Sequence, residues 1–586
     1  MFIELVELGK RIRKGHDALA PCQCDYDIII NKNGEFLKLL ECDCQLVSEY
    51  IPTTAKNGKA RLLLDKAEET LAFEGIEENE SKQEVNGNFE EDGSTDQKQD
   101  GKKQDQPLYK KKHTRYLDKL NEYKELSVLA PIFSFYSKPK EVEKALNKFK
   151  TLPKSKQKGN MTFLVDGAYR PLSLDCVLET IKEKYNEKTS TFAEKKMICS
   201  VCGKSDYPII EDPHGGVTLP GSDKKCSLVS YNNPSFLSYN LKRNLNSGIC
   251  QNCARNYVGA LAYLSKSEWT TSENGKKFKV YENAIELSDD TLITFWTKEP
   301  NDDVDPFSDI YQPKEERVKN LFSSIAFGDK LRVDTDVENF FYCCTLSSTA
   351  ARIAVRDWIS ISISQYQKNL KQWFEDIATL KEGKVYYPGI NVILNNCIKK
   401  KKKPTQSDFK AKARIGTMLW HAALTKSSLH IMIMQSVLDQ IEHGRFSEEK
   451  STVIRLVLNR NPKYTYKMKK ELDEQNESKA YLCGRLFALI CKLQYKAQGT
   501  VNSSIKDRFF AQASNMPGKV MGMLLSKYVP VYEKKTKGAY AKSITDIAAR
   551  IRHFPDRLST MERGEFALGY YYQYASKHNE HNNEEE

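Results

Sequence analysis

The sequence predicts an α+β protein in which a mixed, β-rich N-terminal part is followed by a C-terminal helical bundle. Short apolar runs, several alternating with period two, occur before residue 364, and such runs are typical of strands. From residue 365 onward, apolar residues recur mostly at helical spacing. At 586 residues the chain is too long for one hydrophobic core, so we expect two to four domains.

Residues 1–73 form the first predicted segment, which is β-rich. Charged residues interrupt the apolar positions from Met1 to Lys14 and no small-residue cleavage site is present, which predicts a first helix and not a signal peptide. Asn33-Gly34 lies between two apolar runs within 26–40. Because Asn-Gly supplies the positive-φ positions of a tight turn, this stretch predicts a β-hairpin.

Four cysteines flank this hairpin, namely Cys22, Cys24, Cys42 and Cys44. Pairing Cys22 with Cys44 and Cys24 with Cys42 would place all four thiols on one face, where they could bind a second metal ion. A two-residue Asn-Gly loop gives a different register, which pairs Lys32 with Glu35, so the cluster requires a β-bulge. The alternative is four ordinary strand cysteines.

Residues 74–106 are polar, acidic and nearly free of aromatic residues, which predicts a disordered insertion. Residues 107–364 are expected to form an α+β body, with helices over 109–152 and strands at 161–165, 291–297 and 353–364. Strict alternation in the last strand predicts one face with Ile353, Val355, Ile359, Ile361 and Ile363, and an opposite face with Arg352, Ala354, Arg356, Trp358, Ser360 and Ser362.

Residues 365–586 are predicted to form the helical bundle. Three apolar stripes at helical spacing support it. Their members are Leu370, Trp373, Phe374 and Ile377; Met418, Leu419, Ala422 and Ala423; and Leu482, Leu486, Leu489 and Leu493.

Two C-x-x-C pairs predict a structural Zn²⁺ site, formed by Cys199, Cys202, Cys250 and Cys253. Two thiolates at this spacing bind one tetrahedral ion, and a second pair completes the closed site. The 47 residues between the pairs must fold back, so 199–253 is expected to form a zinc-knuckle subdomain. The alternative is four free thiols.

The chain has no apolar run long enough to span a membrane, and a cytoplasmic location with reduced cysteines is expected.

The positive charge is concentrated in the C-terminal part. Residues 380–586 contain 36 Lys and Arg against 20 Asp and Glu, a net +16, whereas the whole chain carries +12. This asymmetry favours a nucleic-acid partner, although a well-solvated helical surface is the alternative. Five consecutive lysines, Lys399, Lys400, Lys401, Lys402 and Lys403, are either a phosphate-binding loop or a solvated one.

Two further groups are candidate nucleic-acid contacts. Arg352, Arg356 and Trp358 would share one strand face, where guanidinium and indole groups suit backbone contact and stacking; the alternative is a face covered by helices. Ser230, Asn232 and Asn233 could bond to base edges in the minor groove. The same Asn-Asn-Pro-Ser sequence is also ordinary turn chemistry.

Motifs of common enzyme classes, such as G-x-x-x-x-G-K-[ST], H-E-x-x-H and G-x-S-x-G, are absent from the sequence. His421 and His430 lie on predicted helices and read as core-edge residues. We therefore expect a non-enzymatic protein. The alternatives are an RNA-processing nuclease and a zinc-bearing protein-interaction module.

Several blocks resemble one known family. They are Leu228-Val-Ser-Tyr-Asn232, Asp290-Thr-Leu-Ile-Thr-Phe-Trp296, Ala350-Ala-Arg-Ile-Ala-Val-Arg356, Tyr481-Leu-Cys-Gly-Arg-Leu-Phe-Ala488, Asn502-Ser-Ser-Ile-Lys-Asp-Arg-Phe-Phe-Ala511, Phe554-Pro-Asp-Arg-Leu558 and Phe566-Ala-Leu-Gly-Tyr-Tyr-Tyr-Gln573. In their order they resemble the large subunit of the type I-C CRISPR surveillance complex (Cascade). Lys506 and Arg508, in the fifth block, are further candidate nucleic-acid contacts.

The resemblance implies recognition of the protospacer-adjacent motif (PAM) on target duplex DNA, help with R-loop formation and recruitment of the helicase-nuclease in antiviral defence. The implied partners are guide RNA, target DNA, the backbone and guide-processing subunits, and the helicase-nuclease. The family also makes its C-terminal helical part separately by internal translation. Met468 is the candidate start here, which would give a small subunit over about 467–586.

Overall fold

The computed structural model describes residues 1–576 apart from 14, 17, 52–59, 75–106, 192–195, 206, 209–213, 273–274, 276, 302–303, 315, 319–338, 350, 382–383, 400, 402 and 443–445. The insertion predicted at 74–106 therefore lies almost wholly outside the described residues. The chain divides into an N-terminal unit of 2–216 with 229–260, and a C-terminal unit of Met1, 217–228 and 261–586. The predicted boundaries at 73, 106 and 364 stay a prediction.

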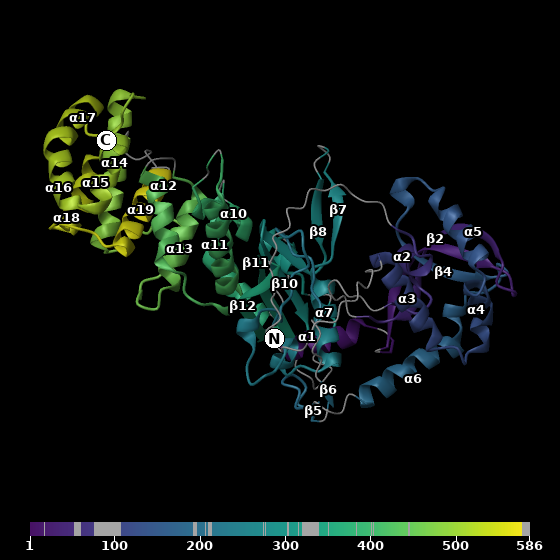
Figure 1. Ribbon diagram of the computed structural model, residues 1–586. Helices are drawn as coiled ribbons and strands as arrows, with labels where there is room; N and C mark the ends of the chain where they lie inside the picture. Colours follow the sequence, from purple (N-terminus) through teal and green to yellow (C-terminus); the bar gives the residue numbers. More distant parts are fainter. Residues whose placement is uncertain are drawn as a thin grey trace, which may run out of the picture. The chain divides into compact units, whose positions relative to one another are not determined.

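The N-terminal unit contains a four-stranded sheet in the order β2-β1-β4-β3 (Figure 1). Its strands are β1 (Leu19–Ile30), β2 (Phe36–Glu49), β3 (Asp65–Lys66) and β4 (Asn160–Val165). The predicted strand at 161–165 is thus confirmed, and β4 pairs in parallel with β1. This pairing joins the predicted first segment to the predicted α+β body in one sheet.

The predicted hairpin at 26–40 is confirmed, but its loop is longer than a two-residue Asn-Gly turn. The last cross-strand pair is Ile30 with Phe36. The Asn31 side-chain oxygen accepts from the backbone N–H groups of Asn33 and Glu35, at 3.0 and 2.9 Å. Gly34 has φ +77°, and a Cβ at this position would overlap the backbone of α4. The wider loop results from Asn31 satisfying the turn with its own side chain.

The N-terminal unit also contains helices, and some of them contact this sheet. Those that begin in the unit are α1 (Phe2–Ile12), α2 (Ala67–Thr70), α3 (Leu108–Asn121), α4 (Ala130–Tyr136), α5 (Pro139–Lys150), α6 (Asp175–Thr191) and α7 (Gln251–Leu264). The predicted N-terminal helix and the helical region at 109–152 are confirmed. Aromatic residues fill the core between α3, α4, α5 and the sheet, including Tyr123, Phe135, Phe149 and Phe163.

The C-terminal unit contains an antiparallel sheet in the order β12-β11-β10-β9. Its strands are β9 (Ala284–Ser288), β10 (Thr291–Thr297), β11 (Phe340–Thr349) and β12 (Arg352–Ser362). The strand predicted at 291–297 has the predicted bounds. β12 ends two residues earlier than predicted, because Ser362 caps α9 by accepting from the backbone N–H of Gln365.

The predicted faces of β12 are wrong because the strand contains a β-bulge. Asp357 pairs with Thr345 and Val355 with Leu346, so Arg356 is an extra residue. The bulge reverses the alternation. Ile359 therefore packs into the main core with Ile361 beside it, whereas Ile353 and Val355 share the opposite face with Trp358.

Helices make up most of the rest of the C-terminal unit, as predicted for 365–586 (Figure 1). They are α9 (Ile363–Ile377), α10 (Ile390–Cys397), α11 (Gln406–Thr425), α12 (Ile431–Glu442), α13 (Glu448–Arg460), α14 (Lys479–Gln498), α15 (Ile505–Asn515), α16 (Pro517–Met523), α17 (Val529–Thr536), α18 (Ala541–Ile551) and α19 (Thr560–Ala575). Two hairpins accompany them, β7 (Ser267–Thr271) with β8 (Lys277–Tyr281), and β13 (Thr379–Lys381) with β14 (Lys384–Tyr386). One continuous core joins the sheet to the helices. Among the described residues, no helix is both long and apolar enough to span a bilayer.

Candidate functional site

The first C-x-x-C pair forms a tight knuckle after the short strand β5 (Lys196–Met197), which pairs with β6 (Tyr207–Pro208). The Cys199 carbonyl accepts from the N–H of Gly203 at 2.9 Å, and the Cys199 N–H donates to the Lys204 carbonyl at 3.0 Å. Gly203 has φ +69°, which explains a glycine directly after Cys202.

The second pair lies at the start of α7. Gly248, with φ +60°, ends a 3₁₀ turn over 243–247, and the Cys250 carbonyl accepts from the N–H of Ala254 in the first helical turn. Cys253 therefore lies in the first turn of α7. The Gly248 carbonyl accepts from the N–H of Ser200 at 2.8 Å, which holds the two pairs against each other.

The four sulfurs of Cys199, Cys202, Cys250 and Cys253 lie within 4.8 Å of one another. A tetrahedral zinc–thiolate site with Zn–S bonds of about 2.3 Å requires sulfurs about 3.8 Å apart, and the Sγ atoms of Cys202 and Cys250 are 4.0 Å apart. The Cys250 N–H also donates to the Cys199 Sγ at 3.4 Å. Hydrogen bonds from the neighbouring thiols hold the pKa of Cys250 below its ordinary value. The donor set and spacing therefore fit a structural Zn²⁺, which would pin 199–204 to α7.

The hairpin cysteines pair differently from the predicted register. Cys24 lies opposite Cys44, and Cys22 lies opposite Leu46. A bulge follows, because Tyr26 pairs with Glu41 and two residues of β2 face Asp25 alone. A bulge, which the four-thiol cluster required, is thus present, but it gathers three thiols, Cys24, Cys42 and Cys44, within 4.8 Å of one another.

The loop containing Ser230, Asn232 and Asn233 lies in the N-terminal unit. Asn232 and Asn233 are exposed and Ser230 is half-buried. The Asn233 side-chain oxygen accepts from the backbone N–H and the hydroxyl of Ser235, at 3.0 and 2.9 Å. These hydrogen bonds are the turn chemistry of the alternative interpretation. They use the side-chain oxygen of Asn233. The same loop exposes Leu237 and Tyr239, which are 56% and 96% accessible.

Arg352, Arg356 and Trp358 do not share one face, contrary to the prediction. The β12 register places Arg352 and Trp358 on opposite faces. Trp358 packs against the rings of Trp296 and Tyr342, with centroids 5.6 and 5.8 Å apart. Arg356, at the bulge, donates from Nε to the Ser347 hydroxyl at 2.7 Å.

Arg356 lines a cavity of about 530 Å³ in the C-terminal unit. Asp357 lies on the same bulge. Its carboxylate oxygen Oδ2 is 2.9 Å from Nδ1 of His421 on α11. The remaining walls come from α11, α12 and the chain between and after them: Thr417, Met418, Ser427, Ser428, Leu429, His430, Ile431, Asn461 and Pro462. The cavity thus combines a guanidinium, a carboxylate, imidazole and hydroxyl groups with an apolar wall.

Sequence reasoning missed this cavity and its Asp357–His421 pair. The sequence predicts that His421 and His430 are core-edge residues, because their helical neighbours are apolar. The His421 side chain is 42% exposed. No local pattern could have found the pair, since 64 residues separate its members and the bulge decides where Asp357 lies.

The lysine run lies between α10 and α11. Lys399, Lys401 and Lys403 are exposed, and Lys400 and Lys402 lie outside the described residues. The Lys401 Nζ lies 2.7 Å from the Asp408 carboxylate, which lowers the pKa of Asp408 to about 2 together with the Thr405 cap. One lysine of the run is therefore anchored to the first turn of α11.

Lys506 and Arg508 lie on α15. The Arg508 guanidinium lies 5.3 Å from the ring centroid of Phe509 and 5.6 Å from that of Tyr528. Burial and the charge of Lys506 lower the pKa of Lys450 on α13. The two ammonium groups therefore lie close enough to repel each other.

The chain matches the family model described as CRISPR-associated protein (Cas_Csd1) over residues 13–577. The match covers both compact units and every residue predicted to bind metal or nucleic acid. No curated protein matches the chain significantly.

Proposed function

The chain belongs to the Csd1 family of CRISPR-associated proteins, the family of the type I-C Cascade large subunit, and on that premise we propose that it is a non-catalytic nucleic-acid-binding subunit. In this proposal it recognises the PAM on target duplex DNA, assists R-loop formation and recruits the helicase-nuclease. The observation that carries the proposal is the family match over 13–577.

Several exposed cations support contact with the phosphate backbone. Lys399, Lys401 and Lys403 are exposed in one loop. On α15, Arg508 is exposed, and Lys506 is half-buried beside the half-buried Lys450 of α13. Such residues neutralise phosphates without reading sequence, so they would position DNA strands and contribute salt-dependent affinity.

The loop at 228–239 is the candidate for base recognition. Asn232 is exposed, and asparagine amides suit the donor and acceptor pattern of base edges. Tyr239 and Leu237 are exposed beside it, and exposed apolar side chains at base steps are a recurring feature of minor-groove binding. Accordingly, this loop reads the PAM and the lysines hold the backbone.

The test is an electrophoretic mobility shift assay with the reconstituted complex and duplexes that carry a randomised PAM. Asn232→Ala should lose discrimination between PAM sequences while non-specific binding is retained. Replacing Lys399, Lys401 and Lys403 with Ser should weaken binding equally for all sequences. Equal loss of affinity for every sequence in the Asn232 variant would contradict PAM recognition by this loop.

An RNA-processing nuclease is the competing function, and one observation favours it. A nuclease requires a general base, and His421, oriented by Asp357 at the cavity, could provide one. Incubation of the purified chain with guide-RNA precursor decides between the two. We expect no cleavage, and cleavage that disappears in the His421→Ala variant would establish the nuclease instead.

A further inference from the structure

Three cysteines of the β1–β2 hairpin form a thiol cluster separate from the C-x-x-C pairs. Cys24 and Cys44 lie directly opposite each other in the antiparallel ladder, which brings side chains on the same face to about 5 Å. Cys42 joins them because the bulge places residues 42 and 43 against Asp25 alone. In a ladder without the bulge, Cys42 would lie opposite Tyr26, further from Cys24.

The cluster lies at the edge of the N-terminal core. Cys24 is fully buried, and Cys42 and Cys44 are half-buried. Cys42 and Cys44 are packed against the core that contains Tyr26 and Ile28. A ligand bound there would be shielded on one side by the core and remain reachable from solvent on the other.

A second layer of polar groups surrounds the sulfurs. Arg170 Nη2 donates to the Cys42 Sγ at 3.5 Å, and the same guanidinium holds the buried Asp27 carboxylate at 2.6 Å. This contact ties the Cys42 side chain to the Asp27–Arg170 ion pair. Groups that orient metal-binding side chains in this way are typical of metal sites.

The nearby carboxylates have other partners. Asp27 is paired with Arg170. Asp25 accepts from the backbone N–H of Asn160 at 2.7 Å, and Asp43 accepts from the Gln23 amide at 2.6 Å. The donors that remain are therefore sulfurs, which select a soft, thiophilic cation and not Mg²⁺ or Ca²⁺.

We propose that Cys24, Cys42 and Cys44 bind a second thiophilic divalent cation of the Zn²⁺ type, with the fourth position open to water. The 2.7 Å separation of the Cys42 and Cys44 sulfurs would widen to about 3.8 Å around such an ion. Cys22 is the nearest further thiol in the strand, but its sulfur accepts from the Asn160 amide at 3.7 Å. The ion would fix the bulge and the register of the hairpin.

The test is the metal stoichiometry of the full chain, purified under reducing conditions and equilibrated with Zn²⁺. The unchanged protein should bind two equivalents, and Cys42→Ser with Cys44→Ser should bind one. Cys199→Ser with Cys250→Ser should also bind one, and the quadruple variant none. Cys176→Ser, at an exposed cysteine outside both clusters, should still bind two.

The proposal would be overturned if the unchanged protein binds one equivalent of Zn²⁺ and the Cys42 and Cys44 variant still binds one. A metal-free chain whose mass is lower by two hydrogens, with a disulfide located within this cluster, would also overturn the proposal. The cysteines would then form a redox pair. If the double variant does not fold, the single variant Cys42→Ser is measured. The single variant is then titrated with Co²⁺, and the absorption of thiolate-bound Co²⁺ reports how many equivalents bind. We expect one equivalent fewer than in the unchanged protein.

Discussion

Gly484 on α14 lies directly against the backbone of Phe566 on α19, and a Cβ atom at position 484 would overlap the Phe566 carbonyl oxygen. Gly569 has the reciprocal relationship with the Tyr481 carbonyl. These two glycines let the helices approach closely, and α14 carries the longest buried face of the bundle. The family-like blocks at 481–488 and 566–573 thus have a structural explanation.

Replacement of Gly484 by Ala should destabilise the helical region by about 2–3 kcal/mol, because the methyl group meets backbone that cannot rotate away. Gly522→Ala is the matched control. Gly522 is also helical, but a Cβ there would meet nothing within 4 Å, so this change should be neutral or stabilise by up to about 1 kcal/mol. Denaturant unfolding of both variants measures the difference, and equal stabilities would show that α14 and α19 do not pack this closely.

Disruption of the C-x-x-C cluster should loosen the N-terminal unit. Cys199→Ser with Cys250→Ser should lose one equivalent of Zn²⁺ and lower the melting temperature, since structural zinc contributes directly to folding. Cys226→Ser, at a buried cysteine outside both clusters, controls for the loss of a buried thiol. Elemental analysis and thermal melting provide the two measurements. A variant with undiminished zinc content would exclude these residues as ligands.

The N-terminal unit should lose stability as pH falls from about 6.5 to about 4. Burial lowers the pKa of His214 to about 4, and its Nδ1 lies 2.8 Å from the Tyr257 hydroxyl. Below about pH 6.5 the histidine binds a proton in the unfolded chain, whereas in the folded chain it stays neutral down to about pH 4. The free energy of unfolding therefore decreases by up to about 3 kcal/mol over that window. Stability above pH 6.5 is unaffected by this group.

His214→Gln should therefore show a shallower decrease in unfolding free energy between pH 7 and pH 4 than the unchanged protein. His553→Gln, a change at an exposed histidine, should retain the original slope. Denaturant titrations at a series of pH values compare them. An unchanged slope in the His214 variant would mean that another group dominates the acid response.

The lysine run should contribute salt-dependent DNA affinity. With all five residues from Lys399 to Lys403 replaced by Ser, the slope of log affinity against log salt should decrease by about 0.9 per lost phosphate contact. The control replaces five exposed lysines of the N-terminal unit: Lys110, Lys124, Lys140, Lys148 and Lys154. If both variants give the same slope, the run contributes only net charge.

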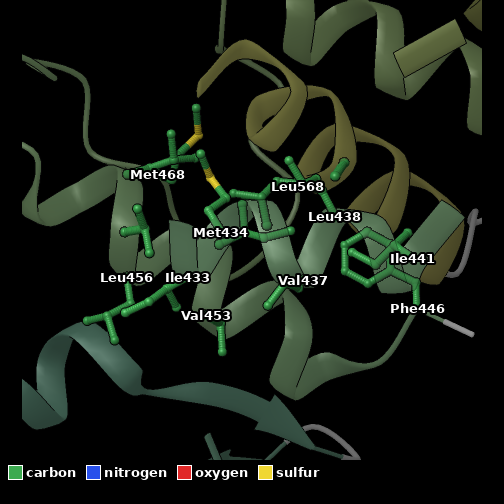
Figure 2. Close-up of a cluster of buried hydrophobic side chains, with 14 of the residues drawn as sticks. Ile433, Met434, Val437, Leu438, Ile441, Phe446, Val453, Leu456, Met468 and Leu568 are labelled. Atoms are coloured by element: carbon green, nitrogen blue, oxygen red, sulfur yellow. The ribbon is translucent and has the colours of Figure 1, made fainter. Parts of the chain in front are cut away.

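A separate C-terminal fragment starting at Met468 should co-purify with the full chain. Helices α14 to α19 pack on one another around Phe487, Phe510 and Phe566, which gives the fragment its own core. Met468 itself is buried, and Figure 2 shows it with Leu568 among side chains of α12 and α13, such as Met434 and Leu456. The free fragment would expose this apolar face, so we expect it to remain bound to the complex. Mass spectrometry of the complex tests this, and a fragment that vanishes with protease inhibitors would be a degradation product.

The sequence by itself determined the features that depend on neighbouring residues. The strand at 291–297, the apolar stripe of α14 and the hairpin at 26–40 follow from local periodicity and turn residues, which act over a few positions. The two C-x-x-C pairs likewise indicated one site, because each pair has the spacing of a knuckle whatever surrounds it. The blocks that resemble the family identified it, and the match over 13–577 confirms the assignment.

Only the tertiary structure decided which distant residues meet. The bulge at Arg356 separates Arg352 from Trp358 and brings Asp357 to His421, and the bulge opposite Asp25 brings Cys42 to Cys24 and Cys44. A bulge shifts every later side chain to the other face, yet it costs the sequence only one residue and leaves no periodic signal. The register of long-range pairs is set by the packing of the whole core, and for that reason alternation along a single strand could not predict these sites.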